Sequence, residues 1–572
     1  MDDEQKPDEL NLPVQPAPEE QVARPPEESE PVAVLAEKPA FYVAAWRWYL
    51  ARKKWTIPAS ILLAILVLAA IPWSRYHAAA LVIKKDLTVE IKDSKTNTPV
   101  SGAAVSYAGQ TLITNAEGKA VLPKLKAGHH PAVISKKYYK DQPIDIFSPI
   151  LAPKNPSRVS LIATGRQVPV HVTDYVDDKP LAGATITIAD TNAKTDSKGD
   201  ATVVVPAGLN EQKAVAKLEG YNDGQFTVNA DAQQPAATKI KLVPAGKIYF
   251  FSKRTGKLDL MKANLDGSST ETVLAGTGYE QVASSFISQS PDWKYIALVI
   301  KRSSADATPQ LYILSTGDDR LLNVDGGNAN FVVQGWSGSH LIYTAAQADL
   351  PDYQTGKAKL KSYDAATGKT TQLDQTKGSN NEDGTAAESY AATIVSGGNV
   401  IYAKNWAIAG TAKGQEHSLN VIGVDGQDYK LAASYPSSDT VYYSQHTANS
   451  IYVWQQPHAG TDSFYDYTIG SAPKQVNINS NDFYSGTQGY YPSPSGKYIL
   501  WTEQRDGKNT LLIGDQSGGT QNVASFSDYL PFGWYTDKYL ILTKTGSELY
   551  ILGTHGGSPL KITDYQYTNY YF

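Results

Sequence analysis

The chain of 572 residues contains no cysteine. This absence excludes disulfide bonds, thiolate nucleophiles, cysteine-ligated zinc and iron–sulfur sites, and a lipid-modified cysteine anchor. A strong charge of one sign is also missing, because 52 Lys and Arg oppose 57 Asp and Glu and leave a net charge of −5. A value so close to neutral gives no reason to expect nucleic acid as a partner. At about 150 residues per domain, the length predicts roughly four folded units.

The charge is unevenly distributed along the chain. Residues 1–40 hold eleven acidic and three basic residues, a net charge of −8, so the rest of the chain carries +3. The same segment has eight prolines and no aromatic residue, and such a composition buries too little apolar surface to offset the entropy of ordering. We predict a disordered, Pro-rich acidic tail over 1–40, either a solvated spacer or a contact for a cytoplasmic partner.

One long uncharged run follows a basic and aromatic juxtamembrane segment at 41–54. The nineteen residues from Trp55 to Trp73 lack charge, and Leu, Ile, Val and Ala fill their centre. This length matches the hydrocarbon core of a bilayer, and terminal tryptophans suit the headgroup level. We predict one transmembrane helix at 55–74, uncleaved because more than fifty residues precede it, with a cleaved signal peptide as the alternative. Four basic residues before the run and three after it favour a cytoplasmic N-terminus and extracytoplasmic C-terminal domains in the cell membrane.

Two copies of one small β domain come next, with alternating residues and turn punctuation. When the copies are superimposed at a shift of 81 residues, identical residues coincide. The coinciding pairs are Pro99 with Pro180, Gly102 with Gly183, Ala103 with Ala184, Thr114 with Thr195, and Gly118 with Gly199. Tyr139 and Tyr221 coincide at a shift of 82. The pattern predicts two short β-sandwiches.

The motifs PVSGAAV and PLAGATI, each followed by T-[N/D]-x-x-G-x-A and an aromatic pair or Gly-Tyr, resemble carboxypeptidase regulatory-like domains. These are transthyretin-like or immunoglobulin-like sandwiches found on exported and cell-surface proteins. The resemblance implies domains at 86–163 and 167–243 that act as spacers or binding accessories. It implies no catalytic residue.

A longer repeat begins at Lys247. Seven strand-like runs recur 41 to 59 residues apart, and each is followed by a second strand that ends in a hairpin turn. The runs are KIYFFS, YIALVI, LIYTAA, VIYAKN, IYVWQQ, YILWTE and YLILTK. This period predicts a seven-bladed β-propeller at 246–572. Because the first blade begins at its second strand, we predict that roughly Gln566–Phe572 supplies the missing innermost strand and closes the ring.

Short turns precede several of these runs. They are Ser290-Pro291-Asp292-Trp293-Lys294-Tyr295, Ser493-Pro494-Ser495-Gly496-Lys497-Tyr498, Gly335-Trp336-Ser337 and Gly533-Trp534-Tyr535. They resemble the W-S-P-D-G-K-x-I-A phrase of TolB-like and dipeptidyl-peptidase-type propellers. The peptidases of this kind keep their catalysis in an α/β-hydrolase segment. Since no such segment follows the propeller in this sequence, we do not expect their activity.

The sequence offers no catalytic constellation. G-x-S-x-G and H-E-x-x-H do not occur, and the nine histidines show no metal-ligand spacing. We therefore predict no catalytic, cofactor-binding or metal-binding residue, no cofactor, and a protein that is not an enzyme; the ligand-binding residues are unknown. Tyrosine is abundant, with 28 of 36 after residue 242, which suits recognition of a protein or glycan but also suits half-buried strands.

The predicted fold class is all-β with one transmembrane helix, two small β-sandwich domains and a seven-bladed β-propeller. The function predicted from this organisation is that of a single-pass bacterial surface protein that presents the propeller on a two-domain stalk, for binding or scaffolding at the cell envelope. Two alternatives remain open. One is a propeller-based hydrolase or lyase of the envelope, and the other is a component of an envelope transport or division complex.

Overall fold

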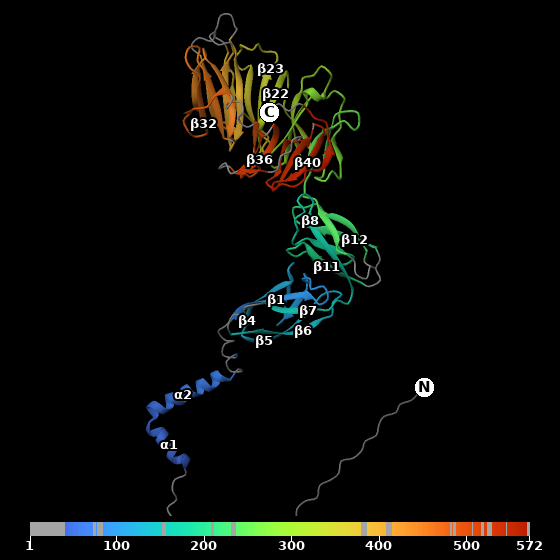
Figure 1. Cartoon of the computed structure of the whole chain (residues 1–572), viewed down its shortest axis with the longest axis vertical. Helices are drawn as coiled ribbons and strands as arrows, with labels where there is room; N and C mark the ends of the chain where they lie inside the picture. Colours follow the sequence, from blue (N-terminus) through green and yellow to red (C-terminus); the bar gives the residue numbers. More distant parts are fainter. Residues whose placement is uncertain are drawn as a thin grey trace, which may run out of the picture. The chain divides into compact units, whose positions relative to one another are not determined.

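The computed structural model of the chain is built almost entirely from β-strands (Figure 1). It describes residues 41–71, 76, 84–150, 156–206, 211–229, 236–378, 386–407, 415–447, 449–480, 483, 488–505, 507–515, 520–522, 529–544 and 546–568. The chain divides into two units, Met1–Ile83 and Lys84–Phe572. The predicted acidic tail at 1–40 lies outside the described residues.

The first unit contains two helices, α1 (Phe41–Ala51) and α2 (Lys53–Ala70). The side chains of the two helices meet where they join. The Tyr49 hydroxyl donates to Ser60 Oγ at 2.8 Å, and Thr56 Oγ1 donates to the carbonyl of Tyr49 at 2.6 Å. The joint is therefore fixed by side-chain hydrogen bonds.

The transmembrane helix predicted at 55–74 is not found. Among the described residues, no helix is both long enough and apolar enough to cross a membrane. The helix α2 ends at Ala70 and starts with Lys53 and Lys54, so its uncharged part covers only Trp55–Ala70. A span requires about 20 apolar residues.

Two β-sandwiches of identical topology begin the second unit. The first pairs a sheet of order β4-β1-β7 with one of order β3-β2-β5-β6, and the second pairs β11-β8-β14 with β10-β9-β12-β13. The strands of the first sandwich are β1 (Lys84–Asp93), β2 (Ala104–Tyr107), β3 (Gln110–Ile113), β4 (Lys119–Lys126), β5 (Gly128–Ser135), β6 (Gln142–Ser148) and β7 (Ser157–Leu161). Those of the second are β8 (Arg166–Asp174), β9 (Thr185–Ile188), β10 (Thr191–Lys194), β11 (Asp200–Val205), β12 (Glu211–Lys217), β13 (Gly224–Asn229) and β14 (Thr238–Leu242).

The residues that the two copies share make equivalent contacts in both sandwiches. Thr114 Oγ1 accepts from the amide of Ala103 at 2.8 Å, and Thr195 Oγ1 accepts from the amide of Ala184 at 2.9 Å. Gly118 has a φ of +68° and its counterpart Gly199 one of +76°, and a Cβ on either would lie 2.4 Å from a backbone carbonyl oxygen. Only glycine fits this turn. The internal repeat of the sequence is therefore a repeat of hydrogen bonds and close approaches.

An aspartate joins each sandwich to the domain that follows it. Asp93 ends β1, and its carboxylate accepts from Gln167 Nε2 of the second sandwich at 2.5 Å. Its counterpart Asp174 ends β8 and accepts from Tyr221 at 2.7 Å and from Tyr539 of the propeller at 2.6 Å. Burial, helped by the Asp174 carboxylate, raises the pKa of Tyr221 to about 12. The same position thus contributes to both joints between domains.

Seven successive antiparallel sheets follow, which is the arrangement of a β-propeller (Figure 1). Blade 1 has β15 (Ile248–Ser252), β16 (Asp259–Ala263) and β17 (Glu271–Leu274), and the short 3₁₀ helix η1 (Val282–Ser284) precedes blade 2. Blade 2 has β18 (Phe286–Gln289), β19 (Tyr295–Ile300), β20 (Gln310–Ser315) and β21 (Arg320–Asp325); blade 3 has β22 (Ala329–Ser337), β23 (His340–Gln347), β24 (Ala358–Asp364) and β25 (Lys369–Gln375). Blade 4 has β26 (Glu388–Ser396), β27 (Asn399–Trp406), β28 (Glu416–Gly423) and β29 (Lys430–Pro436); blade 5 has β30 (Thr440–Thr447), β31 (Ser450–Gln456), β32 (Ser463–Thr468) and β33 (Lys474–Val476). Blade 6 has β34 (Gln488–Pro492), β35 (Tyr498–Arg505), β36 (Lys508–Asp515) and β37 (Thr520–Asn522); blade 7 has β38 (Tyr529–Thr536), β39 (Tyr539–Lys544), β40 (Glu548–Gly553) and β41 (Leu560–Asp564).

The Gly-Trp pairs of the sequence tie first strands of neighbouring blades together. In blade 3, Trp336 Nε1 donates to Ser288 Oγ of blade 2 at 3.2 Å. In blade 7, Trp534 Nε1 donates to the carbonyl of Tyr491 in blade 6 at 2.6 Å. The preceding glycine sits at a register shift with a φ near +145° in blade 7, a conformation that glycine permits.

Blade 1 differs from the others because its described residues form three strands. Blades 2 and 7 contact each other directly, since Trp293 Nε1 donates to the carbonyl of Trp534 at 2.8 Å. After β41 the chain reaches the edge of β15, where the amide of Gln566 donates to the carbonyl of Phe251 at 2.7 Å. The predicted closing strand itself extends into 569–572, outside the described residues, and stays a prediction.

Side-chain carboxylates link each blade to the next one from blade 1 to blade 5. Each comes from the end of one blade and accepts from a side chain of the next blade. The pairs are Glu280 with Arg302 at 3.1 Å, Asp325 with Lys361 at 2.5 Å, Asp374 with Lys404 at 3.0 Å, and Asp439 with Gln455 at 2.6 Å. Tyrosines add to two of them, because Tyr343 donates to Asp325 and Tyr390 to Asp374. Blade order is therefore reinforced by buried or half-buried polar contacts as well as by apolar packing.

Candidate binding site of the propeller

Many tyrosines of the propeller are part of its core. Tyr343, Tyr402 and Tyr467 are among the largest fully buried side chains. Burial, together with the carboxylate of Asp325, raises the pKa of Tyr343. The abundance of tyrosine after residue 242 is thus to a large extent structural, and a recognition site has to be found from cavities instead.

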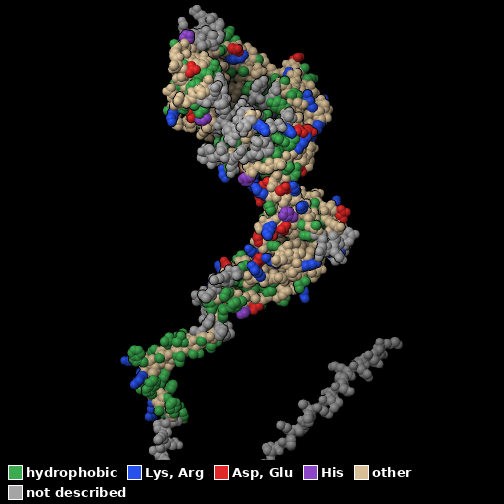
Figure 2. Space-filling view, in the orientation of Figure 1, with side chains coloured by type: hydrophobic (Ala, Val, Ile, Leu, Met, Phe, Trp, Pro, Cys, Tyr) green, Lys and Arg blue, Asp and Glu red, His purple; other side chains and the backbone are tan. Residues whose placement is uncertain are grey.

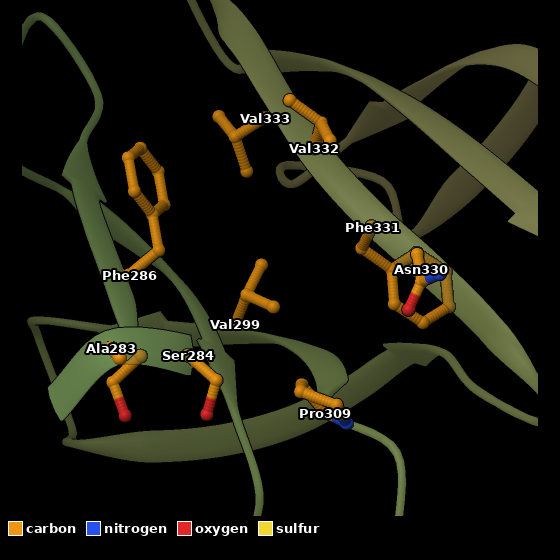
Figure 3. Close-up of a pocket in the computed structure, with 10 residues that line it drawn as sticks. Ala283, Ser284, Phe286, Val299, Pro309, Asn330, Phe331, Val332 and Val333 are labelled. Atoms are coloured by element: carbon orange, nitrogen blue, oxygen red, sulfur yellow. The ribbon is translucent and has the colours of Figure 1, made fainter. Parts of the chain in front are cut away.

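An apolar cavity of about 250 Å³ lies between the first strands of blades 2 and 3 (Figure 3). Phe286, Val299 and Val333 surround its open centre. Few polar groups line it, and the buried Ser284 Oγ, which belongs to the lining, has no hydrogen-bond partner among the described residues. This cavity is smaller than the roughly 300–1,000 Å³ typical of small-molecule sites.

A larger cavity of about 420 Å³ lies between blades 4 and 5. It combines aromatic side chains with polar ones, and its volume falls within the usual range of ligand sites. Its lining residues are Ala391, Asn405, Trp406, His417, Asp439, Thr440, Val441, Tyr442, Tyr443 and Phe483. We refer to it below as the blade 4–5 cavity.

Hydrogen bonds between the two blades hold the wall of this cavity. Asn405 Nδ2 donates to the carbonyl of Val441 at 2.8 Å, and Asn405 Oδ1 accepts from the Tyr443 hydroxyl at 3.1 Å. The ring of Tyr442 lies 5.2 Å from that of Trp454, which in turn packs on Phe483 at 5.6 Å. Tyr442 is 39 % exposed, so an aromatic face remains available beside fixed polar groups.

His417 links the end of β27 to the connection between blades 4 and 5 as a neutral imidazole. Its Nδ1 accepts from the amide of Trp406 at 3.1 Å, so its Nε2 carries the proton and donates to the carbonyl of Asp439 at 3.0 Å. Burial lowers the pKa of His417, and the Asp439 carbonyl opposes this only in part. Both nitrogens are occupied, which makes His417 a positioning residue of the cavity wall.

Acidification tests this assignment of His417. Below about pH 6.5 an unfolded histidine binds a proton that folded His417 resists, so stability falls as the pH falls, at most by about 1.4 kcal/mol per pH unit. We expect the wild-type melting temperature to drop more between about pH 7 and pH 5 than that of His417→Gln. Equal drops in thermal unfolding curves would show that His417 titrates normally in the folded chain.

A second polar cluster occupies three neighbouring strands of blade 5. The Tyr452 hydroxyl lies 2.9 Å from His446 Nε2, and the two rings stack with centroids 3.8 Å apart. On the other side of the imidazole, Asp466 Oδ1 lies 3.4 Å from His446 Nδ1, and both atoms are buried without a hydrogen-bond partner in the described part of the chain. A carboxylate, an imidazole and a phenol thus lie close together.

The described residues contain no group of three or more His, Asp or Glu side chains arranged to hold a metal ion. We predicted no site residue from the sequence, so the side chains that line the blade 4–5 cavity were missed at that point. The pair Tyr442-Tyr443 was the visible signal, because its first residue is exposed in the cavity while its second bonds to Asn405.

Comparisons by sequence give no family. No protein-family model matches the chain, and no curated protein matches it. The carboxypeptidase regulatory-like assignment of the two sandwiches therefore stays a prediction. Solved structures do resemble the chain, at low identity.

The β-propeller domain of the trilobed protease from Pyrococcus furiosus is 11 % identical, with 67 % of this chain and 97 % of that chain covered and a TM-score of 0.35. An acylaminoacyl peptidase from Pyrococcus horikoshii is 13 % identical over 66 % of this chain, with a TM-score of 0.33; the chain spans about half the length of that peptidase, 52 %. TolB from Acinetobacter baumannii is 14 % identical, with 54 % and 75 % covered and a TM-score of 0.25. TolB-like and peptidase-type propellers are the classes that the blade turns resemble.

The prediction that the chain is not an enzyme is contradicted by these comparisons, because the protease and the peptidase are enzymes. Sequence reasoning relied on the absence of known catalytic motifs, and propeller residues far apart in sequence escape such a search. Identities of 11–14 % concern the fold alone, so they name no reaction for this chain.

Proposed function

We propose that the chain is an extracytoplasmic protein of the cell envelope, held at the membrane by its N-terminal segment, whose propeller binds a glycan in the blade 4–5 cavity. The observation that carries the proposal is the composition of that cavity. An exposed aromatic ring stands beside amide, hydroxyl and carboxylate groups in a volume of about 420 Å³. Aromatic faces receive the apolar face of a sugar ring, and fixed polar groups orient its hydroxyls.

The polar groups of the cavity are held in place before any ligand binds. Asp439 is 6 % exposed and accepts from Gln455 at 2.6 Å, and Asn405 is fixed between Val441 and Tyr443. A wall that is already ordered loses little side-chain entropy when a ligand binds. The two sandwiches, joined to the propeller through Asp174, support the domain as a stalk.

Replacement of Tyr442 with alanine tests the site. In calorimetric titrations of the detergent-solubilised full chain with neutral and acidic cell-wall oligosaccharides, Tyr442→Ala should weaken binding about tenfold, the loss expected for an aromatic contact worth about 1.4 kcal/mol. Tyr279→Ala is the matched control, because Tyr279 is 43 % exposed and lies outside the cavity. Equal affinities of the two variants would exclude the blade 4–5 cavity as the binding site.

The cluster in blade 5 favours a second candidate, a propeller-based hydrolase or lyase. Asp466 lies 3.4 Å from His446 Nδ1, and His446 Nε2 is placed to exchange a proton with the Tyr452 hydroxyl at 2.9 Å. Incubation of the full chain with the same oligosaccharides distinguishes the candidates. Hydrolysis creates new reducing ends and elimination creates an unsaturated, ultraviolet-absorbing product, and His446→Gln should abolish either; a chain that leaves all oligosaccharides intact supports binding alone.

A further inference from the structure

We propose that α1 and the joint between α1 and α2 bind the surface of an anionic lipid bilayer. This inference rests on the membrane location proposed above and adds the chemistry of the lipid. It concerns Phe41–Lys54, which we call the basic elbow.

The basic elbow exposes large apolar side chains. Phe41 is 88 % exposed, Tyr42 73 % and Trp46 62 %, and no residue of α1 is buried. Hydrophobic side chains cover both helices in the space-filling view (Figure 2). Contiguous exposed apolar surface of this kind marks a contact with a membrane or a partner. Aromatic residues favour the headgroup level of a bilayer, where the ring is half solvated.

The charge of this segment distinguishes between an anionic lipid and a second copy of the chain as the partner. Arg47, Arg52, Lys53 and Lys54 give Phe41–Ile71 four positive charges, and no acidic residue occurs in that range. Anionic headgroups attract such clusters, and each basic residue close to the surface adds to the affinity. A second copy of the same segment would bring equal positive charges together. The charge pattern therefore favours an anionic lipid over self-association.

The joint keeps these charges together at one end of both helices. The guanidinium of Arg52 lies over the ring of Trp48 at 5.3 Å, and Tyr49 of α1 is bonded to Ser60 and Thr56 of α2. Because α2 begins at Lys53, its two lysines follow Arg52 directly in the chain. Cationic and aromatic groups thus form one compact surface.

Vesicle flotation of the full chain tests the proposal, with vesicles of phosphatidylcholine alone and with added phosphatidylglycerol. We expect much stronger binding to the second kind, a loss of that difference at high salt, and a loss of about a hundredfold in affinity for Arg47→Glu/Lys53→Glu/Lys54→Glu. The matched control is Lys198→Glu/Lys213→Glu/Lys239→Glu, which reverses three exposed charges of the second sandwich and should bind like wild type.

Each other outcome has a definite meaning. Equal binding to both kinds of vesicle would overturn the proposed preference for anionic lipid, while the proposed membrane location would stand. Binding to neither would overturn both, whereas the oligosaccharide titrations would still decide the role of the propeller. Oligomers in lipid-free detergent that the triple charge reversal abolishes would identify a second copy as the occupant and contradict the proposal.

Discussion

Replacing Lys404 with alanine lowers the free energy of unfolding by about 3–5 kcal/mol, the cost of leaving buried charges without their partner. Lys404 is 5 % exposed, and its Nζ lies 3.0 Å from Asp374 and 3.2 Å from Glu388. Glu388 is itself 4 % exposed. In the variant, two carboxylates of neighbouring blades face each other with no cation between them. The measurement is the midpoint of the propeller's unfolding transition in urea.

Two companion variants make the result interpretable. Lys561→Ala removes a lysine that also contacts two carboxylates, Glu548 and Asp564, but at an exposed site where water screens the charges, so its midpoint should stay close to that of wild type. Adding Glu388→Gln to Lys404→Ala removes one of the two unpaired charges and should restore part of the loss. A Lys404→Ala midpoint equal to that of Lys561→Ala would show that the contact between blades 3 and 4 contributes nothing.

The second large effect is expected at the joint between the second sandwich and the propeller. Asp174 is 3 % exposed and accepts from two tyrosine hydroxyls and from the amide of Val176 at 2.6 Å. Asp174→Ala leaves two buried donors, the Tyr539 hydroxyl and the Val176 amide, unpaired at about 1–3 kcal/mol each, so we expect a loss of about 2–6 kcal/mol. Calorimetry should also show the sandwich and the propeller unfolding in separate transitions.

The repeat supplies a natural control for this experiment. Asp93 occupies the same place in the first sandwich and accepts from Gln167 of the second. Asp93→Ala should therefore destabilise the two sandwiches and leave the propeller transition unchanged. If both variants shift the same transition, the joints do not act separately, and the correspondence between Asp93 and Asp174 would have no energetic meaning.

Periodic features were predictable because they depend on neighbours in the sequence. The hairpins of the blades, and the turns at Gly118 and Gly199, follow from local patterns of apolar residues and from a φ that glycine alone adopts freely. The apolar run at 55–74 forms a helix over much of its length, as predicted, but among the described residues no helix is long and apolar enough to cross a membrane. Hydropathy measures apolar composition and does not fix where a helix stops.

Contacts between distant residues were not predictable. Asp174 and Tyr539 are 365 residues apart, and only the folded ring brings them together. The blade 4–5 cavity likewise draws on residues from Ala391 to Phe483, and its neutral histidine is defined by backbone groups that no sequence pattern identifies. A single sequence lacks the pairings across blades that create such a site.

A crystal structure of the chain with the oligosaccharide that binds most tightly tests the central claim most directly. We predict a sugar ring packed against Tyr442 in the blade 4–5 cavity, with its hydroxyls bonded to polar groups of that wall. A sugar bound instead in the apolar cavity between blades 2 and 3, or against Asp466, His446 and Tyr452, would contradict the proposed site.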